Sequence, residues 1–321
     1  MKKWICTALL VLLPAAAFAA SSTLASSTFD WAYPVPPPDL PPPDNKELRT
    51  AKGSTTGLKL TVVQINDEHA TPDWFPSEHP PMPPIVAYGR GPHIPACIMC
   101  HLPNGAGHPE SANIAGLTPD YIVAQMHEFR DGNRTGIRAV RMIAMAKEIT
   151  EDELKQAAAY FASIRPENQK WARVVESATA PKHRPGPGGK LVLEKSGGTV
   201  PIPANMNYEI AEDEDGALNR DQHYGMIDYV PMGSIAKGEA LAMSGGNGKT
   251  VACAVCHGPD LKGLGNVPRL AGRPAYYTIR QLNDMKTGAR KGASVALMEA
   301  VVARLSDEDI VNLAAYTASR Q

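Results

Sequence analysis

Two short stretches decide the fold of this chain: Cys97-Ile98-Met99-Cys100-His101 and Cys253-Ala254-Val255-Cys256-His257. Each has the pattern Cys-x-x-Cys-His, and on a helix residues at i, i+3 and i+4 lie on one face. Two thiols and one imidazole then point the same way, which is the attachment signature of c-type haem. The pattern predicts two covalently bound haem c groups, held by Cys97, Cys100, Cys253 and Cys256, with His101 and His257 as iron ligands.

A redox dithiol and half of a zinc site are the other interpretations of a single Cys-x-x-Cys-His. The two motifs use every cysteine of the chain except Cys6, so none is left to complete a zinc site. Disulfides are common in exported proteins, but the histidine after each second cysteine favours haem.

The two motifs belong to a longer internal repeat with a constant offset of 156 residues, from Cys97 to Cys253. About 19 of the 67 positions in 97–163 are identical in the second copy. The period is too long for a solenoid and indicates two copies of one domain. Identical pairs include Gly107 and Gly263, Tyr121 and Tyr277, Gln125 and Gln281, Arg134 and Arg290, and Tyr160 and Tyr316.

The repeat also indicates the sixth iron ligand. Met142 and Met298 are equivalent, and each lies 41 residues after the histidine of its motif. The methionine thioether stabilises ferrous haem and raises its potential. A single methionine is more often core filler, which makes Met145 the nearest rival in the first copy. His93, four residues before Cys97, is a further candidate for a distal ligand.

Local signals predict mainly helices. Nothing inside the repeats alternates like a strand, and Thr150 with Glu153 and Ser306 with Asp309 resemble capping boxes that open the last helix of each copy. Helices are expected over 85–88, 119–131, 235–243 and 274–287. A strand is expected over 58–65, and short strands over 171–175 and 190–195.

The start of the chain resembles a secretory signal. Lys2 and Lys3 precede the apolar run 4–13, and Ala17-Phe18-Ala19 offers the small residues that a signal peptidase reads. We expect 1–19 to be a signal peptide cleaved near Ala19 and the mature protein to be periplasmic. The run is too short to span a membrane, and no later stretch reaches about 18 apolar residues, so no transmembrane segment is expected.

Composition narrows the range of partners. The chain has 32 Lys and Arg against 33 Asp and Glu, a net charge of -1, which gives no electrostatic footprint for nucleic acid. Only 6% of the residues are aromatic. A covalently attached haem would supply the apolar body that two small helical domains otherwise lack.

With these motifs in place, the two copies resemble class I c-type cytochrome domains in tandem, as in diheme cytochromes of the bacterial periplasm. The resemblance also rests on the Pro268–Gly272 stretch and on the helix start after Leu305. It implies an all-α fold, and that the carbonyl of Pro268 orients His257, with Ala112 at the equivalent position of the first copy. The expected organisation is a signal peptide (1–19), a proline-rich extension (20–80), a first cytochrome c domain (81–165), a long irregular linker (166–231) and a second cytochrome c domain (232–321).

The resemblance implies electron transfer. If His and Met close both irons, the protein passes electrons between a redox protein donor and an acceptor, free or as a subunit of a periplasmic dehydrogenase or oxidase chain. The alternative is a diheme enzyme with one open haem, a peroxidase or a sulfur-compound dehydrogenase. Methionines at equivalent positions in both copies make a peroxidase with an open haem less favoured. A thiosulfate dehydrogenase with a cysteine ligand is also disfavoured, because the two motifs use every cysteine that remains after removal of the signal peptide. Catalytic residues are therefore not expected.

Overall fold

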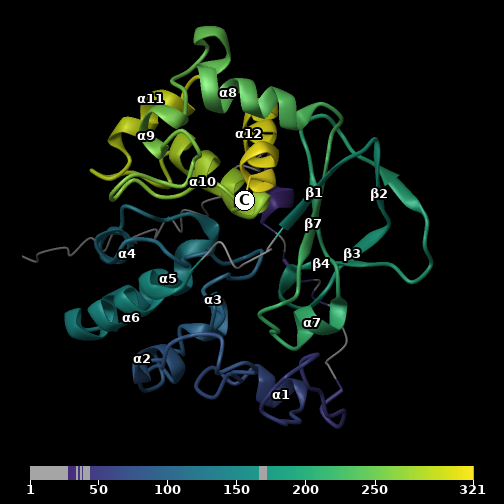
Figure 1. The fold of residues 1–321 in the computed structure, drawn as a ribbon, viewed down its shortest axis with the longest axis vertical. Coiled ribbons are helices and arrows are strands. Elements are labelled where there is room, and N and C mark those ends of the chain that lie inside the picture. The colour runs from purple at the N-terminus through teal and green to yellow at the C-terminus, as the bar shows by residue number, and fades with distance from the viewer. Residues whose placement is uncertain (1–27, 34, 37, 39–43, 166–171, 321) are drawn as a thin grey trace, which may run out of the picture.

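The computed structural model describes residues 28–33, 35–36, 38, 44–165 and 172–320. The expected signal peptide and much of the proline-rich stretch lie outside these residues. Figure 1 shows two groups of helices, α2–α6 and α8–α12, one above the other, with a β-sheet beside them. Across the described ranges, no helix is long and apolar enough to cross a membrane.

The helices repeat as the sequence does. Three pairs of helices, α3 and α9, α4 and α10, and α6 and α12, begin and end at residues related by the 156-residue offset. The first copy contains α2 (Pro84–Ala87), α3 (Ile98–His101), α4 (Pro119–Arg130), α5 (Val140–Glu148) and α6 (Glu151–Ser163). The second contains α8 (Ser234–Gly248), α9 (Ala254–His257), α10 (Ala275–Lys286), α11 (Ala296–Val302) and α12 (Asp307–Ser319).

Both predicted capping boxes are present. The Thr150 hydroxyl accepts from the backbone N–H of Glu153 at the start of α6, and Glu153 reaches back to the N–H of Thr150. Ser306 and Asp309 make the same reciprocal bonds at the start of α12. Each box satisfies two N–H groups that the first turn of a helix leaves unpaired. The helix expected over 235–243 is α8, whose regular part ends where Gly245 turns left-handed.

The expectation of an all-α fold with an irregular linker is wrong. The linker forms a five-stranded sheet in the order β1-β7-β6-β4-β3 and a two-stranded sheet of β2 and β5. The strands are β1 (Ala172–Glu176), β2 (Thr179–Pro181), β3 (His183–Pro185), β4 (Leu191–Leu193), β5 (Thr199–Pro201), β6 (Tyr208–Ala211) and β7 (Met226–Val230). Only β1 and β4 overlap the expected short strands. The first strand pairs in parallel with the last, a contact between distant segments that local periodicity does not reveal.

The strand expected over 58–65 is also wrong. Only Leu60 makes an isolated bridge, with Arg49, and the helix α1 (Val62–Ile65) follows. Thr61 forms a capping box with Gln64, so a local helix-start signal overrides a weak alternation of apolar residues.

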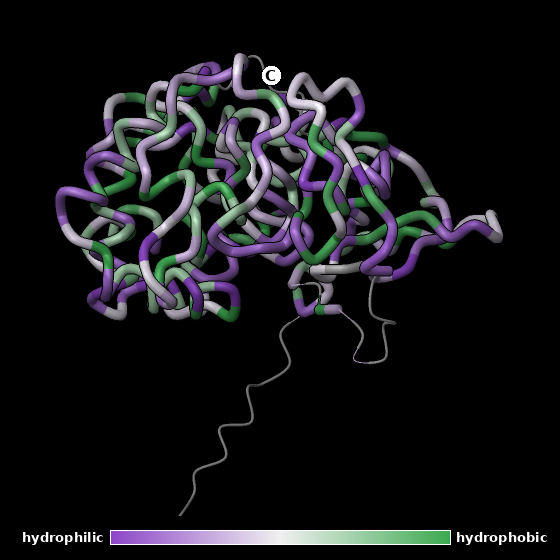
Figure 2. The backbone as a smooth tube through the Cα atoms, turned by 90° about the horizontal axis from the view of Figure 1, so that it is seen from below, coloured by the Kyte–Doolittle hydropathy of each residue, from purple (hydrophilic) through white to green (hydrophobic). Residues whose placement is uncertain are grey.

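Each helical copy has its own apolar core, and hydrophobic and hydrophilic stretches alternate along the backbone (Figure 2). The short helix η1 (Asp30–Ala32) belongs to the second core, because Phe29 and Tyr33 on either side of it are buried against α10 and α12. The start of the described chain is thereby held by its last domain.

A buried pair of carboxyl groups joins the sheet to α10. Glu209 on β6 lies opposite Asp228 on β7, and both side chains are inaccessible to solvent. An oxygen of Glu209 accepts from the N–H of Tyr276 at 3.0 Å, in the first turn of α10. Burial raises the pKa of Glu209 to about 7 and the pKa of Asp228 well above its usual range. A proton shared between two facing carboxyl groups removes the repulsion between their charges.

This pair makes stability depend on pH. Because the folded-state pKa of Glu209 is raised, its contribution is complete below the unfolded pKa of about 4.3 and is lost as the pH rises to about 7. We expect the free energy of unfolding to fall by on the order of 2 kcal/mol between pH 5 and pH 8 in denaturant titrations. Replacing both carboxyl groups of the pair, Glu209→Gln with Asp228→Asn, should flatten this slope, whereas the exposed Glu299→Gln should retain it. A steep slope in the double variant would contradict the assignment.

Candidate functional site

Both Cys-x-x-Cys-His motifs fold as one helical turn. In each, the first cysteine is the N-cap residue and the remaining four residues form α3 or α9. Cys97 and Cys100 pack against the core of the first copy, and Cys253 against that of the second. The thiols and the imidazole of each motif therefore share one face of one turn, as the spacing predicts.

The two histidines are held in the same way. His101 Nδ1 donates to the carbonyl of Ala112 at 2.9 Å, and His257 Nδ1 donates to that of Pro268 at 2.7 Å. Burial lowers the pKa of both imidazoles. With the proton fixed on Nδ1, the Nε2 lone pair of each neutral ring is free to bind a metal. The carbonyl contact expected at Pro268 is thus present in both copies.

The cysteine environments do not suit a reactive dithiol. Burial raises the pKa of Cys97 to about 12 and that of Cys253 to about 11. Thiolates attack disulfides and bind zinc, and redox cysteines have lowered pKa values for that reason. The buried, neutral thiols of Cys97 and Cys253 do not suit a redox dithiol, whereas Cys256 is exposed.

The two predicted methionines lie beside the same cores as the motifs. Met142 is half-buried against the core that Cys97 and Cys100 contact, and Met298 is half-buried against the core that Cys253 contacts. Met145, the rival, is fully buried among apolar side chains. His93 is exposed on the surface.

A pseudo-twofold contact joins the two copies. The N–H of Thr135 donates to the carbonyl of Ala289 at 2.7 Å, and the N–H of Lys291 donates to that of Asn133 at 2.8 Å. Each bond is the 156-residue image of the other. Arg134 and Arg290 lie opposite each other between the two bonds. The interface is therefore isologous within one chain.

Side chains that are identical in the repeat complete this contact. Arg134 donates to Gln125 and Gln281 at 3.0 and 2.9 Å, and Arg290 donates to the same two amide oxygens at 2.8 and 2.9 Å. Arg290 also donates to the hydroxyl of Tyr121 at 3.2 Å. The identity of these residues was visible in the sequence, but their role in the interface was not, because a repeat does not indicate which residues meet across it.

Several buried donors near this interface lack acceptors within the described residues. They are Nε and Nη2 of Arg138, Nε of Arg290 and Nε2 of Gln125. An unpaired buried donor costs about 1–3 kcal/mol of stability. Here the unpaired N–H groups belong to two arginine side chains and one glutamine side chain. Anionic acceptors would satisfy these donors, in addition to the charge of Glu110 that already acts on Arg138. The two propionates of a haem have that chemistry, so the residues present fit the cofactor that the motifs imply.

Comparison with known proteins matches a family model to the second copy. The family model described as Cytochrome c matches residues 235–321. The chain is 40% identical over 85 residues to cytochrome c-554(548) of Halomonas halodenitrificans, which covers 26% of this chain and 99% of that protein. It is 27% identical over 233 residues to the thiosulfate dehydrogenase electron acceptor of Thiomonas intermedia (strain K12). The aligned region covers 71% of this chain and 80% of that protein.

A solved structure is similar to most of the chain. The thiosulfate dehydrogenase (TsdBA) from Marichromatium purpuratum aligns with a TM-score of 0.50 and 28% identity over 73% of this chain. This chain spans only 38% of the length of that protein.

Proposed function

The chain belongs to the cytochrome c family as a diheme c-type cytochrome, and from that membership we propose which of its residues hold the haems and how it exchanges electrons. It carries covalently bound haem c and transfers electrons between a redox enzyme and an acceptor. The observation that carries the proposal is the identical arrangement of both motifs, each with its histidine Nδ1 on a backbone carbonyl.

Each copy of the repeat supplies the residues that hold one haem. Cys97 and Cys100 hold one haem and Cys253 and Cys256 the other, with His101 and His257 as proximal ligands. When bound, each haem iron accepts and releases one electron. The carbonyls of Ala112 and Pro268 fix the proton on Nδ1, so that Nε2 of each ring would be free to bind the iron. We place the two haem domains at 81–165 and 232–321, with the sheet-forming linker between them.

The unpaired buried donors are candidates to hold the haem propionates. Arg138, Arg290 and Gln125 offer unpaired N–H groups next to the contact between the copies. These three residues would donate to haem propionates and so help to hold the haems, which would supply the electron exchange between the two copies.

Met142 and Met298 are the proposed sixth ligands. With both irons closed, substrate has no coordination site, which is why we propose a carrier rather than an enzyme. We propose that the protein is exported to the periplasm after cleavage near Ala19. Because relatives are named for thiosulfate dehydrogenase, we propose a dehydrogenase of that kind as the electron donor.

The test is a visible and near-infrared spectrum of the purified ferric protein, repeated with cyanide and with peroxide. We expect low-spin haem with a weak methionine-to-iron band near the red edge, unchanged by either addition. A high-spin signal or rapid ligand uptake at one haem would overturn the carrier function and favour a diheme peroxidase or dehydrogenase.

A further inference from the structure

One linker residue, Arg220, reaches the first motif. Its guanidinium donates to the carbonyl of Met99, within the motif itself, and to Nε2 of His108 at 3.0 Å. It also donates twice to the side-chain oxygen of Asn66 in the extension, at 2.9 and 3.1 Å. Arg220 therefore joins the linker, the extension and the haem-binding turn of the first copy.

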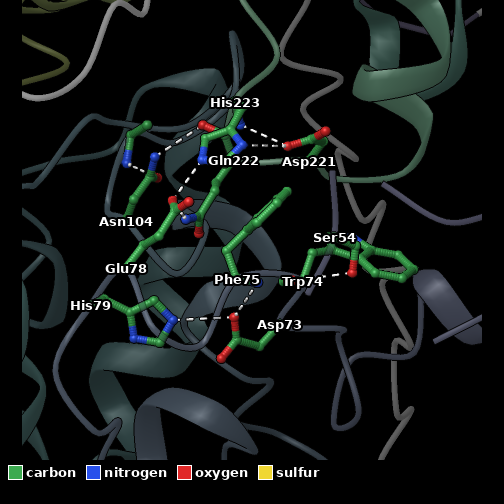
Figure 3. Close-up of polar contacts among 11 residues, drawn as sticks. Ser54, Asp73, Trp74, Phe75, Glu78, His79, Asn104, Asp221, Gln222 and His223 are labelled. Atoms are coloured by element: carbon green, nitrogen blue, oxygen red, sulfur yellow. Dashed lines mark hydrogen bonds and ion pairs between the residues drawn. The ribbon is translucent and has the colours of Figure 1, made fainter. Parts of the chain in front are cut away.

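Contacts between the linker and the extension hold Arg220 in place. Its backbone has a φ of 53°, in the left-handed region that residues other than glycine rarely adopt, so tertiary contacts must support it. Just before it, the carbonyl of Asn219 accepts from the indole N–H of Trp74 at 2.8 Å. Just after it, Gln222 donates to Glu78 at 2.8 Å (Figure 3). The fold on both sides of Arg220 thus fixes where its guanidinium lies.

The partners of Arg220 do not cancel its charge. Met99 offers a carbonyl and Asn66 an amide, and His108 is neutral because burial lowers its pKa well below the usual range. Among the residues that the structure describes, no carboxylate forms an ion pair with this guanidinium. A half-buried cation with only neutral contacts acts at longer range than one that is paired.

The other charges that act on the first motif come in opposite pairs. Arg141 and Glu68 both act on Cys100, but they form a salt bridge with each other. Lys190 and Glu110 also act on Cys100, with opposite signs. Burial raises the pKa of the Cys100 thiol, and the field of the linker guanidinium opposes that shift. This guanidinium is therefore the unmatched cation next to the first attachment site.

The second copy has a cation of its own, which comes from within the repeat. Burial lowers the pKa of His257, the hydrogen bond to Pro268 raises it, and the charge of Arg273 lowers it. The residue of the first copy that is equivalent to Arg273 is Leu117, which is buried and apolar. The first copy thus lacks this arginine, and its motif receives a cation from the linker.

We infer that Arg220 raises the reduction potential of the haem held by Cys97 and Cys100, and so shifts an electron shared between the two haems toward the first. Ferric haem carries one more positive charge than ferrous haem, so a nearby cation disfavours the ferric state. In the exchange one electron leaves the second iron, which is oxidised, and reduces the first, and no bond forms or breaks. This inference rests on the proposed electron-carrier function and identifies a residue that decides where the electron resides.

The experiment is a redox titration of the full-length holoprotein, followed in the visible region. Arg220→Gln removes the charge but keeps an amide that can donate to the carbonyl of Met99. We expect the equilibrium constant for electron sharing between the haems to change about tenfold in favour of the second, which corresponds to about 59 mV for one electron. Only the potential of the first haem should fall. Titrations of Met142→Ala and Met298→Ala assign each potential to its haem.

Three further variants separate the charge of Arg220 from its structural contacts. Arg220→Lys keeps the charge, so the electron-sharing constant should stay within about threefold of its original value. Asn66→Asp keeps the contacts with Arg220 but places a carboxylate against the guanidinium, so it should lower the first potential as Arg220→Gln does. Arg184→Gln is the matched control, because Arg184 is a half-buried arginine of the same linker that pairs with Glu214. It should leave both potentials unchanged.

Unchanged potentials in Arg220→Gln, or an equal fall of both, would overturn the inference. An equal loss in Arg220→Lys would also overturn it, because the shape of the side chain and not its charge would then matter. If Arg220→Gln does not take up haem, Asn66→Asp decides alone, and an unchanged first potential in that variant overturns the inference. The spectra with cyanide and peroxide test the carrier function separately. An open haem together with a lowered first potential would overturn the carrier function and still support the role of Arg220.

Discussion

Met298→Ala is expected to abolish about half of the weak methionine-to-iron band of the ferric protein and to lower the potential of one haem by on the order of 0.1 V. The thioether favours ferrous iron, and axial ligands set haem potentials over about 0.8 V. Met298 is half-buried against the core that contains Cys253. A redox titration followed in the visible region resolves the shifted haem from the unshifted one.

Met285→Ala is the control, because Met285 is also half-buried against this core and has no equivalent methionine in the first copy. It should leave the band and both potentials in place. In the first copy, Met142→Ala should act like Met298→Ala, and Met145→Ala should not. An unchanged spectrum in Met298→Ala would contradict the assignment of Met298 as the sixth iron ligand.

Gly238→Ala is expected to destabilise the second copy by about 3 kcal/mol. Helices α8 and α12 cross at Gly238, where a Cβ atom would lie 2.6 Å from the Cβ of Tyr316 and closer still to the carbonyl of Asn312. That backbone cannot move without separating the helices, and overpacking of this kind typically costs 1–3 kcal/mol or more. The gain in helix propensity is at most about 1 kcal/mol.

Denaturant unfolding of the holoprotein, followed by the absorbance of the haems, measures this cost. Ala236→Ser is the control, since Ala236 is exposed on the same helix and should change stability by less than about 0.5 kcal/mol. If Gly238→Ala lowered the free energy of unfolding by less than about 0.5 kcal/mol, the close contact between α8 and α12 would not be needed for stability.

Features that depend on local spacing were predictable from the sequence. The motifs fix three side chains on one helical turn, so haem attachment follows from five residues. The capping boxes at Thr150 and Ser306 follow from the N–H groups that a helix leaves unpaired. The 156-residue offset is reproduced in the helix boundaries, because identical local signals produce identical local structure.

Contacts between distant segments were decided only by the tertiary structure. The strand β7 is paired with β1, about fifty residues earlier in the chain. The sequence of neither strand indicates which other strand it pairs with. Repetition identified Arg134 and Arg290 as equivalent, but only packing shows that they meet. The difference between the two copies comes from residues outside the repeat. Arg220, from the linker, binds the first motif, and among the residues that the structure describes no arginine of the linker binds the second. The periodicity of a sequence indicates what structure each segment forms by itself. The burial of Met99 and the exposure of Val255, its equivalent in the second copy, instead depend on segments outside the repeat that pack on the first copy alone.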